Sequence, residues 1–196
     1  RQVGADEFGG QPRALADRHH QPVAVRRYRG LRQCRLEARQ PEALRILSGA
    51  TAEMCAGELA QVGSKFDLDL DEEAYFGIIR RKTASLFAAA CELGTVDNPA
   101  GERHAPALRE FGLQLGTAFQ VTDDFLDLAG TERETGKTLG CDIGQGKLTL
   151  PVIRLLGTLP AAERDALRAW LVGDAPVEEK KRRVWRMVVD RGLDTD

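Results

Sequence analysis

Three aspartates stand within five positions of a segment whose other residues are mostly apolar. They are Asp123, Asp124 and Asp127, and Gln120 lies one helical turn before them. Positions three and four apart share one face of an α-helix, where like charges destabilise the helix. A divalent cation relieves that repulsion, and magnesium commonly bridges one or two carboxylates to phosphate oxygens. The cluster therefore predicts either a magnesium site on a helix or an acidic helix face exposed to solvent.

Apolar residues recur at intervals of three and four from Pro41 onward, which is the spacing of one helix face. Asp71 is a suitable N-cap for one expected helix, and Gly94 can end it. The next expected helix, residues 105–128, has an apolar stripe made of Leu108, Phe111, Leu115, Phe119 and Leu126. Further helices are expected over 43–61, 148–156, 161–171 and 176–191, with a glycine-rich loop over 130–146. No β pattern or internal repeat occurs, so the sequence predicts an all-α helical bundle.

Composition excludes several classes of protein. The chain has 196 residues, 42% of them hydrophobic, which is enough for the core of one domain. Its formal charge of −2 predicts neither a nucleic-acid partner nor binding to an anionic membrane surface. No run of 18 apolar residues occurs, so no stable membrane insertion is expected. The four cysteines are scattered and none adjoins a histidine, which favours reduced thiols in a cytoplasmic protein over a zinc site.

Residues 1–40 differ in composition from residues 41–196. They contain nine arginines, no lysine and four acidic residues, a local charge of +5, whereas the remainder sums to −7. Glycine and proline interrupt this Arg-rich segment, and it lacks helical periodicity. Three explanations fit: a disordered basic arm, a basic binding tail, or an out-of-frame reading of GC-rich coding DNA. We expect the structured domain to occupy residues 41–196.

Three lysines lie where they could meet phosphate oxygens as compact point charges. Lys82 precedes Thr83 in the middle of an expected helix made mostly of apolar and small residues. Lys137 and Lys147 lie in the glycine-rich loop that directly follows the acidic helix. Each lysine alone is more typical of a solvated surface charge. Together with the aspartates, they predict a site for a metal ion and an anion. The loop is not a P-loop, because it lacks the spacing of that motif and no strand precedes it.

Four segments resemble motifs of the trans-isoprenyl (polyprenyl) diphosphate synthases. They are Gly57-Glu-Leu-Ala-Gln61, Arg81-Lys-Thr83, Phe119-Gln-x-x-Asp-Asp-x-x-Asp127 and Gly136-Lys-x-Leu-Gly-x-Asp-x-x-x-Gly-Lys147-Leu-Thr-Leu-Pro151. They occur in the family's order, and the last two are the most specific. The resemblance covers the C-terminal two-thirds of the family, and the long-chain bacterial branch of octaprenyl and heptaprenyl synthases is the most similar.

This resemblance implies a terpenoid synthase helical bundle, incomplete here at the N-terminus and at the C-terminus, in a homodimer. It implies a Mg²⁺-dependent prenyltransferase of isoprenoid biosynthesis, which condenses an allylic diphosphate with isopentenyl diphosphate. The residues implied to bind magnesium are Asp123, Asp124 and Asp127. Those implied to bind the substrate diphosphate are Lys82, Lys137 and Lys147. Those implied to act in catalysis are Lys82, Thr83 and Gln120. Those implied to line the substrate cavity are Phe119, Glu58 and Gln61.

The chain also departs from the family it resembles. Members have a first aspartate-rich motif that should precede residue 41, but the aspartates there are Asp6 and Asp17, and neither lies in such a motif. One carboxylate cluster cannot hold a diphosphate from both sides, so we expect this chain to be inactive or impaired. Two alternatives stay open. One is a non-catalytic partner subunit of a heteromeric prenyl synthase, and the other is a helical interaction protein without catalysis.

Overall fold

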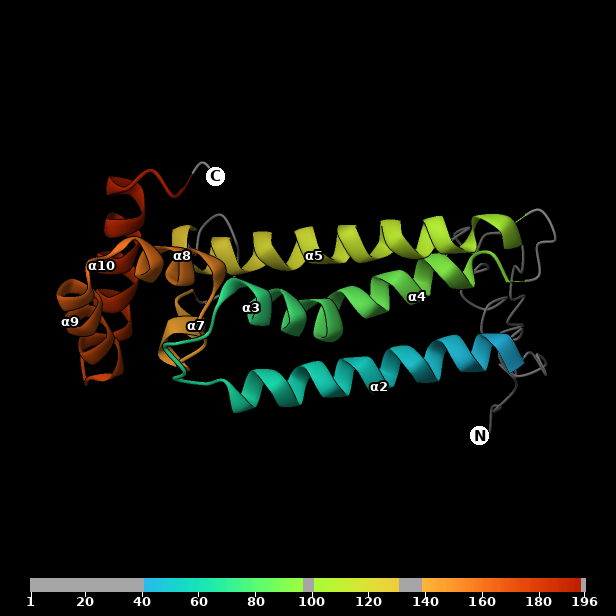
Figure 1. The fold of residues 1–196 in the computed structure, drawn as a ribbon, viewed down its shortest axis with the longest axis horizontal. Helices are drawn as coiled ribbons and strands as arrows, with labels where there is room; N and C mark the ends of the chain where they lie inside the picture. The colour runs from blue at the N-terminus through green and yellow to red at the C-terminus, as the bar shows by residue number, and fades with distance from the viewer. Residues whose placement is uncertain (1–40, 97–100, 131–138, 195–196) are drawn as a thin grey trace, which may run out of the picture. The chain divides into compact units, whose positions relative to one another are not determined.

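The computed structural model describes residues 41–96, 101–130 and 139–194. The helices of its N-terminal part run lengthwise beside one another (Figure 1). They are α2 (Pro41–Gly63), α3 (Glu72–Ile79), α4 (Ser85–Leu93) and α5 (Ala105–Ala129). The π-helix η1 (Arg80–Ala84) joins α3 to α4, and the short η2 (Glu102–His104) precedes α5. The segment α4 packs along α5, while α2 packs against η1 and α4.

Four shorter helices follow α5 and gather beyond its C-terminal end (Figure 1). They are α7 (Cys141–Gly144), α8 (Leu150–Thr158), α9 (Ala161–Val172) and α10 (Val177–Asp190). The main hydrophobic core lies where they meet α3 and the end of α5, and it includes Leu155, Leu167, Val184 and Val188. A separate small cluster, Ile46, Ala50 and Ala89, joins α2 to α4. The predicted all-α bundle is therefore confirmed, and no strand occurs in the described ranges.

Local sequence signals explain where these helices begin and end. The Asp71 side chain accepts a hydrogen bond from the backbone N–H of Ala74 at 2.8 Å and caps α3, as predicted. Gly94 is the C-cap of α4, also as predicted. The sequence suggested one regular helix between these two residues, but η1 interrupts it with a wider turn. Such π-helical turns are rare and are often found at functional sites.

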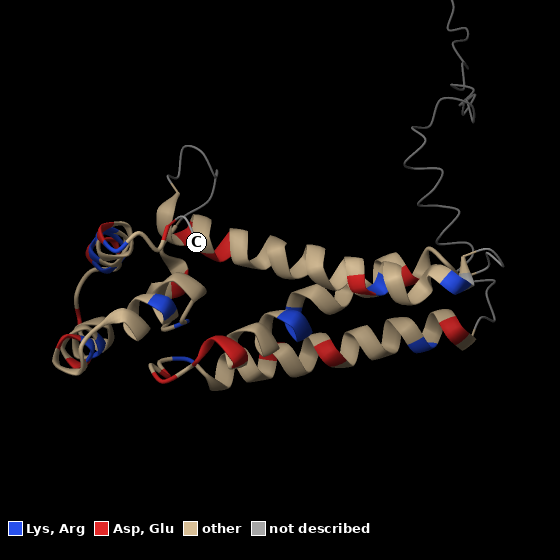
Figure 2. Ribbon diagram, turned by 45° about the horizontal axis from the view of Figure 1, so that its top comes forward, with Lys and Arg blue, Asp and Glu red and all other residues tan. Residues whose placement is uncertain are grey.

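Glycines and alanines make the closest approaches of α5 to η1 and α4. A Cβ atom added to Gly116 would lie 2.6 Å from the Cα atom of Ala84, and one added to Gly112 would lie 2.6 Å from the Cα atom of Ala88. These glycines let the two backbones approach closely. The residues of the apolar stripe expected for α5 are not the ones that make this close contact. They are exposed, and Phe111, for example, is 58% exposed. Figure 2 shows that the charged residues of α5 lie toward its two ends. Residues 111–122 between them carry no charge.

Among the helices of the described ranges, none is both long enough and apolar enough to cross a membrane.

Candidate functional site

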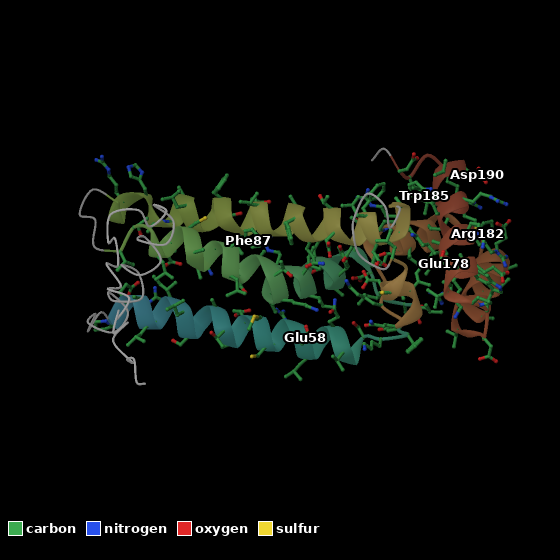
Figure 3. All side chains as sticks on the ribbon, turned by 180° about the vertical axis from the view of Figure 1, so that it is seen from behind. Glu58, Phe87, Glu178, Arg182, Trp185 and Asp190 are labelled. Carbon is green, nitrogen blue, oxygen red and sulfur yellow. The ribbon has the colours of Figure 1, made fainter. Side chains whose placement is uncertain are left out.

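The π-helix η1 brings the Lys82 side chain against α2. The ammonium nitrogen of Lys82 lies 2.7 Å from a carboxylate oxygen of Glu58, and it also donates to the side-chain carbonyl of Gln61. Glu58 and Gln61 are three positions apart on α2, so both face η1. Glu58 is labelled on α2 in Figure 3. Glu58, Gln61 and Lys82, which the sequence resemblance assigned to one site, therefore meet, although α3 separates their two segments in the chain.

Gly57 makes this contact possible. A Cβ atom at Gly57 would lie 2.3 Å from the backbone nitrogen of Lys82, a distance that no real side chain tolerates. Only glycine lets α2 approach η1 closely enough for Glu58 to reach the lysine. Gly57 is buried in this contact between α2 and η1. Its role is to set the distance between two helices rather than to supply a chemical group.

A chain of side-chain hydrogen bonds continues from η1 to α5. The hydroxyl of Thr83 donates to the carboxamide oxygen of Gln120 at 2.7 Å. The amide nitrogen of Gln120 in turn donates to Oδ1 of Asp124 at 2.9 Å. Gln120 and Asp124 are one turn apart on α5, so this second bond is local. The first bond crosses between helices, and it fixes the face that α5 presents to η1.

Asp124 is buried, with none of its surface exposed, and three protein groups donate to it. Lys147 Nζ lies 2.8 Å from Oδ1, the atom that also accepts from Gln120. The hydroxyl of Tyr75 donates to Oδ2 at 2.8 Å. Burial of a carboxylate is costly unless it is paired and hydrogen-bonded, and these donors meet that requirement. Asp124 is an internal anchor for α3, α5 and the segment before α8.

Lys147 lies between two carboxylates. Besides Asp124, its ammonium nitrogen contacts Oδ2 of Asp142 at 3.1 Å, and only 14% of its side chain is exposed. Burial lowers the pKa of Lys147, but attraction by Asp124 and then by Asp142 outweighs it, so the pKa lies above its ordinary value. Burial likewise raises the pKa of Asp142, an effect that Lys147 opposes and the charge of Asp124 reinforces. The lysine is therefore charged and engaged within the protein.

The sequence analysis gave no role to two residues of this site, Tyr75 and Asp142, although Asp142 lies in one of the four motif segments. Tyr75 lies on α3 and is buried, with 2% exposure. Burial raises the pKa of the Tyr75 hydroxyl, and the neighbouring charge and hydrogen bond of Asp124 raise it further. A buried tyrosine needs a partner for its hydroxyl. A tyrosine in a helix expected to be buried therefore signals a hydrogen-bond acceptor nearby. The sequence alone does not identify that acceptor as Asp124.

A family model described as polyprenyl synthetase matches residues 23–188 of the sequence. This chain belongs to the polyprenyl synthetase family. It is 42% identical over 117 residues to "Heptaprenyl diphosphate synthase component 2" of Bacillus subtilis, a stretch that is 60% of this chain and 34% of that protein. It is 37% identical over 120 residues to octaprenyl diphosphate synthase of Haemophilus influenzae, covering 60% of this chain and 36% of that enzyme. The likeness to heptaprenyl and octaprenyl synthases that the motifs predicted is thus confirmed.

Solved structures of polyprenyl synthases share the fold. A polyprenyl synthase from Caulobacter crescentus, solved with calcium and isoprenyl diphosphate, superposes with a TM-score of 0.73 at 34% identity, over 83% of this chain and 49% of that one. A decaprenyl diphosphate synthase from Rhodobacter capsulatus gives 0.69 at 35% identity, over 77% and 46%. This chain thus spans about half of these structures and about a third of the two curated relatives above.

The three aspartates of this polyprenyl synthetase-family chain have different surroundings. Asp124 is enclosed by its three donors, whereas Asp123 and Asp127 are half-buried and lie one turn apart on α5. Oδ2 of Asp127 accepts the backbone N–H of Asp142 at 3.1 Å. Within the described ranges, no group of three or more histidine, cysteine or acidic side chains is placed to hold a metal ion. Two carboxylates nevertheless suit magnesium, which keeps waters and phosphate oxygens as its other ligands.

The remaining predicted site residues are less enclosed, or lie outside the described residues. Phe119 was expected to line a cavity, but 55% of it is exposed. Its ring lies against Phe87 of α4, with centroids 5.5 Å apart; Phe87 is labelled in Figure 3. Lys137 falls outside the described residues. Lys147, predicted to bind the substrate diphosphate, contacts the buried carboxylate of Asp124 and the half-buried carboxylate of Asp142, for which it is the counter-charge.

Proposed function

We propose that this chain carries one wall of the active site of a prenyltransferase, which joins an allylic diphosphate to isopentenyl diphosphate. The observation that carries the proposal is the hydrogen bond from Thr83 of η1 to Gln120 of α5, with Lys82 next to Thr83. Asp123 and Asp127 follow on the same helix as Gln120. Cleavage of a carbon–diphosphate bond is helped by an ammonium group, by carboxylates that hold a metal ion and by oxygen dipoles. The facing residues of η1 and α5 supply all three kinds of group.

The proposed reaction begins when the allylic C–O bond breaks and its electron pair goes to the diphosphate oxygen. The ammonium group of Lys82, held by Glu58 and Gln61, would balance the charge that develops there. The oxygens of Thr83 and Gln120 would direct their dipoles at the allylic carbocation. C4 of isopentenyl diphosphate then bonds to C1 of that cation, and a proton lost from C2 passes to the released diphosphate. Lys137 is proposed as a second diphosphate ligand.

A magnesium ion, when bound, would act as a Lewis acid on the leaving diphosphate. We propose that Asp123 and Asp127 hold it. Asp124 would act indirectly, because its oxygens already accept from Tyr75, Gln120 and Lys147. This assignment narrows the three-aspartate set that the sequence predicted to two direct ligands and one internal anchor.

We propose that this chain alone is inactive or strongly impaired in chain elongation. The two carboxylates proposed to hold magnesium, Asp123 and Asp127, both lie on α5, and a diphosphate held from one side is poorly aligned for ionisation. Purified protein, Mg²⁺, farnesyl diphosphate and labelled isopentenyl diphosphate test this directly. Little or no labelled polyprenyl product is expected, and robust elongation would overturn the proposal.

Binding can be tested apart from turnover. Calorimetry with inorganic pyrophosphate should give a heat of binding that requires Mg²⁺. The double variant Asp123→Asn with Asp127→Asn should lose that binding. Asp165→Asn, at an exposed position on α9, is the control and should keep it. If wild-type protein binds no pyrophosphate at any Mg²⁺ concentration, the proposed site is wrong, and the helical interaction protein without catalysis becomes the better reading.

A partner is also proposed for this chain. The family resemblance implied a homodimer, and the exposed apolar stripe of α5 supports association. A second candidate is one component of a heteromeric synthase, which two relatives named "Heptaprenyl diphosphate synthase component 2" favour. Light scattering of the purified chain separates the two candidates. A dimer of this chain supports the first, whereas a monomer that gains mass only with a second polypeptide supports the other.

The Arg-rich segment, residues 1–40, is proposed to include out-of-frame sequence. The family model begins to match at residue 23, inside this segment, so a change of frame need not coincide with Pro41. Sequencing the locus tests the proposal. An overlapping frame that encodes an Asp-Asp-x-x-Asp motif is expected, and its absence would contradict the idea.

A further inference from the structure

Tyr75 stands apart from the other residues of the site because its ring belongs to the hydrophobic core. It lies in the first turn of α3, is 2% exposed and packs in the main core with residues such as Leu128 and Val152. Its ring meets that of Phe76 edge to face at 5.4 Å. The hydroxyl alone leaves this apolar setting and donates to Oδ2 of Asp124 at 2.8 Å. Tyr75 thus ties the core to the polar network of the site.

The two oxygens of Asp124 have separate sets of donors. Oδ1 accepts from Gln120 at 2.9 Å and from Lys147 at 2.8 Å, whereas Oδ2 accepts from Tyr75. With donors on both oxygens, the plane of the carboxylate cannot turn without breaking one of these contacts. The orientation of that plane sets the position of Oδ1, the atom to which the amide nitrogen of Gln120 donates. Gln120 then presents its carboxamide oxygen to Thr83.

We propose that Tyr75 is a positioning residue of the site, which acts on Gln120 and Lys147 through Asp124 without touching a substrate. Loss of the hydroxyl would leave a buried oxygen of Asp124 without its donor, and the carboxylate would turn toward its remaining donors. Gln120 would lose its fixed orientation toward Thr83. For the effect on ligand binding, this inference rests on the proposed function; the effect on side-chain orientation does not depend on it.

The competing account is that Tyr75 only stabilises the fold. Tyr75→Phe separates the two accounts, because it keeps the ring in the core and removes the hydroxyl. The control is Ile46→Ala, which removes buried atoms from the separate cluster of Ile46, Ala50 and Ala89. Both variants should melt at a lower temperature than the wild-type protein. Only Tyr75→Phe should disturb the site at temperatures where both are folded.

The first measurement needs no ligand. NMR of the side-chain carboxamide of Gln120 and of the Lys147 ammonium group should show shifted or broadened signals in Tyr75→Phe and unchanged signals in Ile46→Ala. The second measurement is Mg²⁺-dependent affinity for inorganic pyrophosphate, expected to fall by about tenfold in Tyr75→Phe alone, the size of one lost bond to a charged group.

Unchanged Gln120 and Lys147 signals in folded Tyr75→Phe would overturn the inference, whatever the melting temperature. Shifted signals with wild-type pyrophosphate affinity would overturn its functional half. Failure of the wild-type protein to bind pyrophosphate would count against the proposed function, and the NMR comparison would still decide the role of Tyr75. If Tyr75→Phe is too unstable, it can be placed in a Gly49→Ala background, where the added Cβ meets no atom within 4 Å.

Discussion

The ammonium nitrogen of Lys147 lies 2.8 Å from Oδ1 of Asp124, a carboxylate that has no exposed surface. The two residues are 23 positions apart, so their contact ties the segment before α8 to the acidic end of α5. A lysine that resembled a surface charge in the sequence is therefore an internal counter-ion. This contact has consequences for stability that can be measured without any substrate.

Replacing Lys147 by methionine should lower the free energy of unfolding by about 3 kcal/mol, because removal of one partner leaves a buried charge uncompensated. Urea denaturation at pH 7 measures the change. Lys65→Met, at an exposed position before α3, is the matched control and should change it by less than about 0.5 kcal/mol. Equal effects of the two variants would mean that the ion pair contributes nothing.

Stability should fall at alkaline pH because of Tyr75 and Lys147. The folded pKa of each lies above its ordinary value, 10.0 for tyrosine and 10.5 for lysine. A raised folded pKa gives stability that is complete below the unfolded pKa and is lost as pH rises through the folded one. The free energy of unfolding should therefore decline from about pH 10 upward. Denaturation curves from pH 8 to 11 test this, and Tyr75→Phe and Lys147→Met should each flatten the decline. A flat wild-type profile would contradict it.

Gly57→Ala should destabilise the protein by about 1–3 kcal/mol, because the new Cβ would overlap the backbone of Lys82 and push α2 away from η1. Gly49→Ala on the same helix is the control. Its Cβ meets no atom within 4 Å, and alanine favours a helix over glycine by about 1 kcal/mol, so this variant should be more stable than wild type. Thermal melts of the two variants should shift in opposite directions. Shifts of the same sign would show that the close approach at Gly57 is not limiting.

Charges placed on the exposed stripe of α5 should reduce self-association. Phe111 and Leu115 are 58% and 46% exposed, so Phe111→Glu with Leu115→Glu should leave helix content unchanged. Light scattering should show a mass that rises with concentration for the wild-type protein and stays monomeric for the double variant. Val189→Glu, at a 42% exposed position on α10, should behave as the wild type. A wild-type protein that is monomeric throughout would rule out the homodimer.

Much of the fold could be predicted from the sequence, because helix signals are local. The Asp71 cap, the end at Gly94 and the long acidic helix follow from residues within a few positions of each other. The η1 interruption could not be predicted, because a π-helical turn differs from an α-helical one by a single residue and leaves apolar spacing nearly unchanged. The order of the family motifs identified the family, but it carried no information about which of their side chains face inward.

Local sequence patterns did not predict which face of α5 is buried or which residues contact Asp124. An apolar stripe such as Phe111 and Leu115 usually marks a buried face, but α5 buries Gly112 and Gly116 against α4, since glycine permits the closer approach. Asp124 could be assigned to a metal ion by its motif alone. Its pairing with Tyr75 and Lys147 arises only when α3, α5 and the segment before α8 are assembled, and no spacing in the sequence encodes that contact.

The wide turn of η1 makes the site sensitive to a change of length as well as of identity. This turn holds one residue more than an α-helical turn would. Loss of Arg81 would let the turn close as a regular α-helix, with α3 and α4 keeping nearly their present orientations. Lys82 and Thr83 lie within the turn, so their side chains would change direction relative to α2 and α5. The loss of a single codon would thus disturb the contacts with Glu58 and Gln120 although every residue that makes these contacts was still encoded.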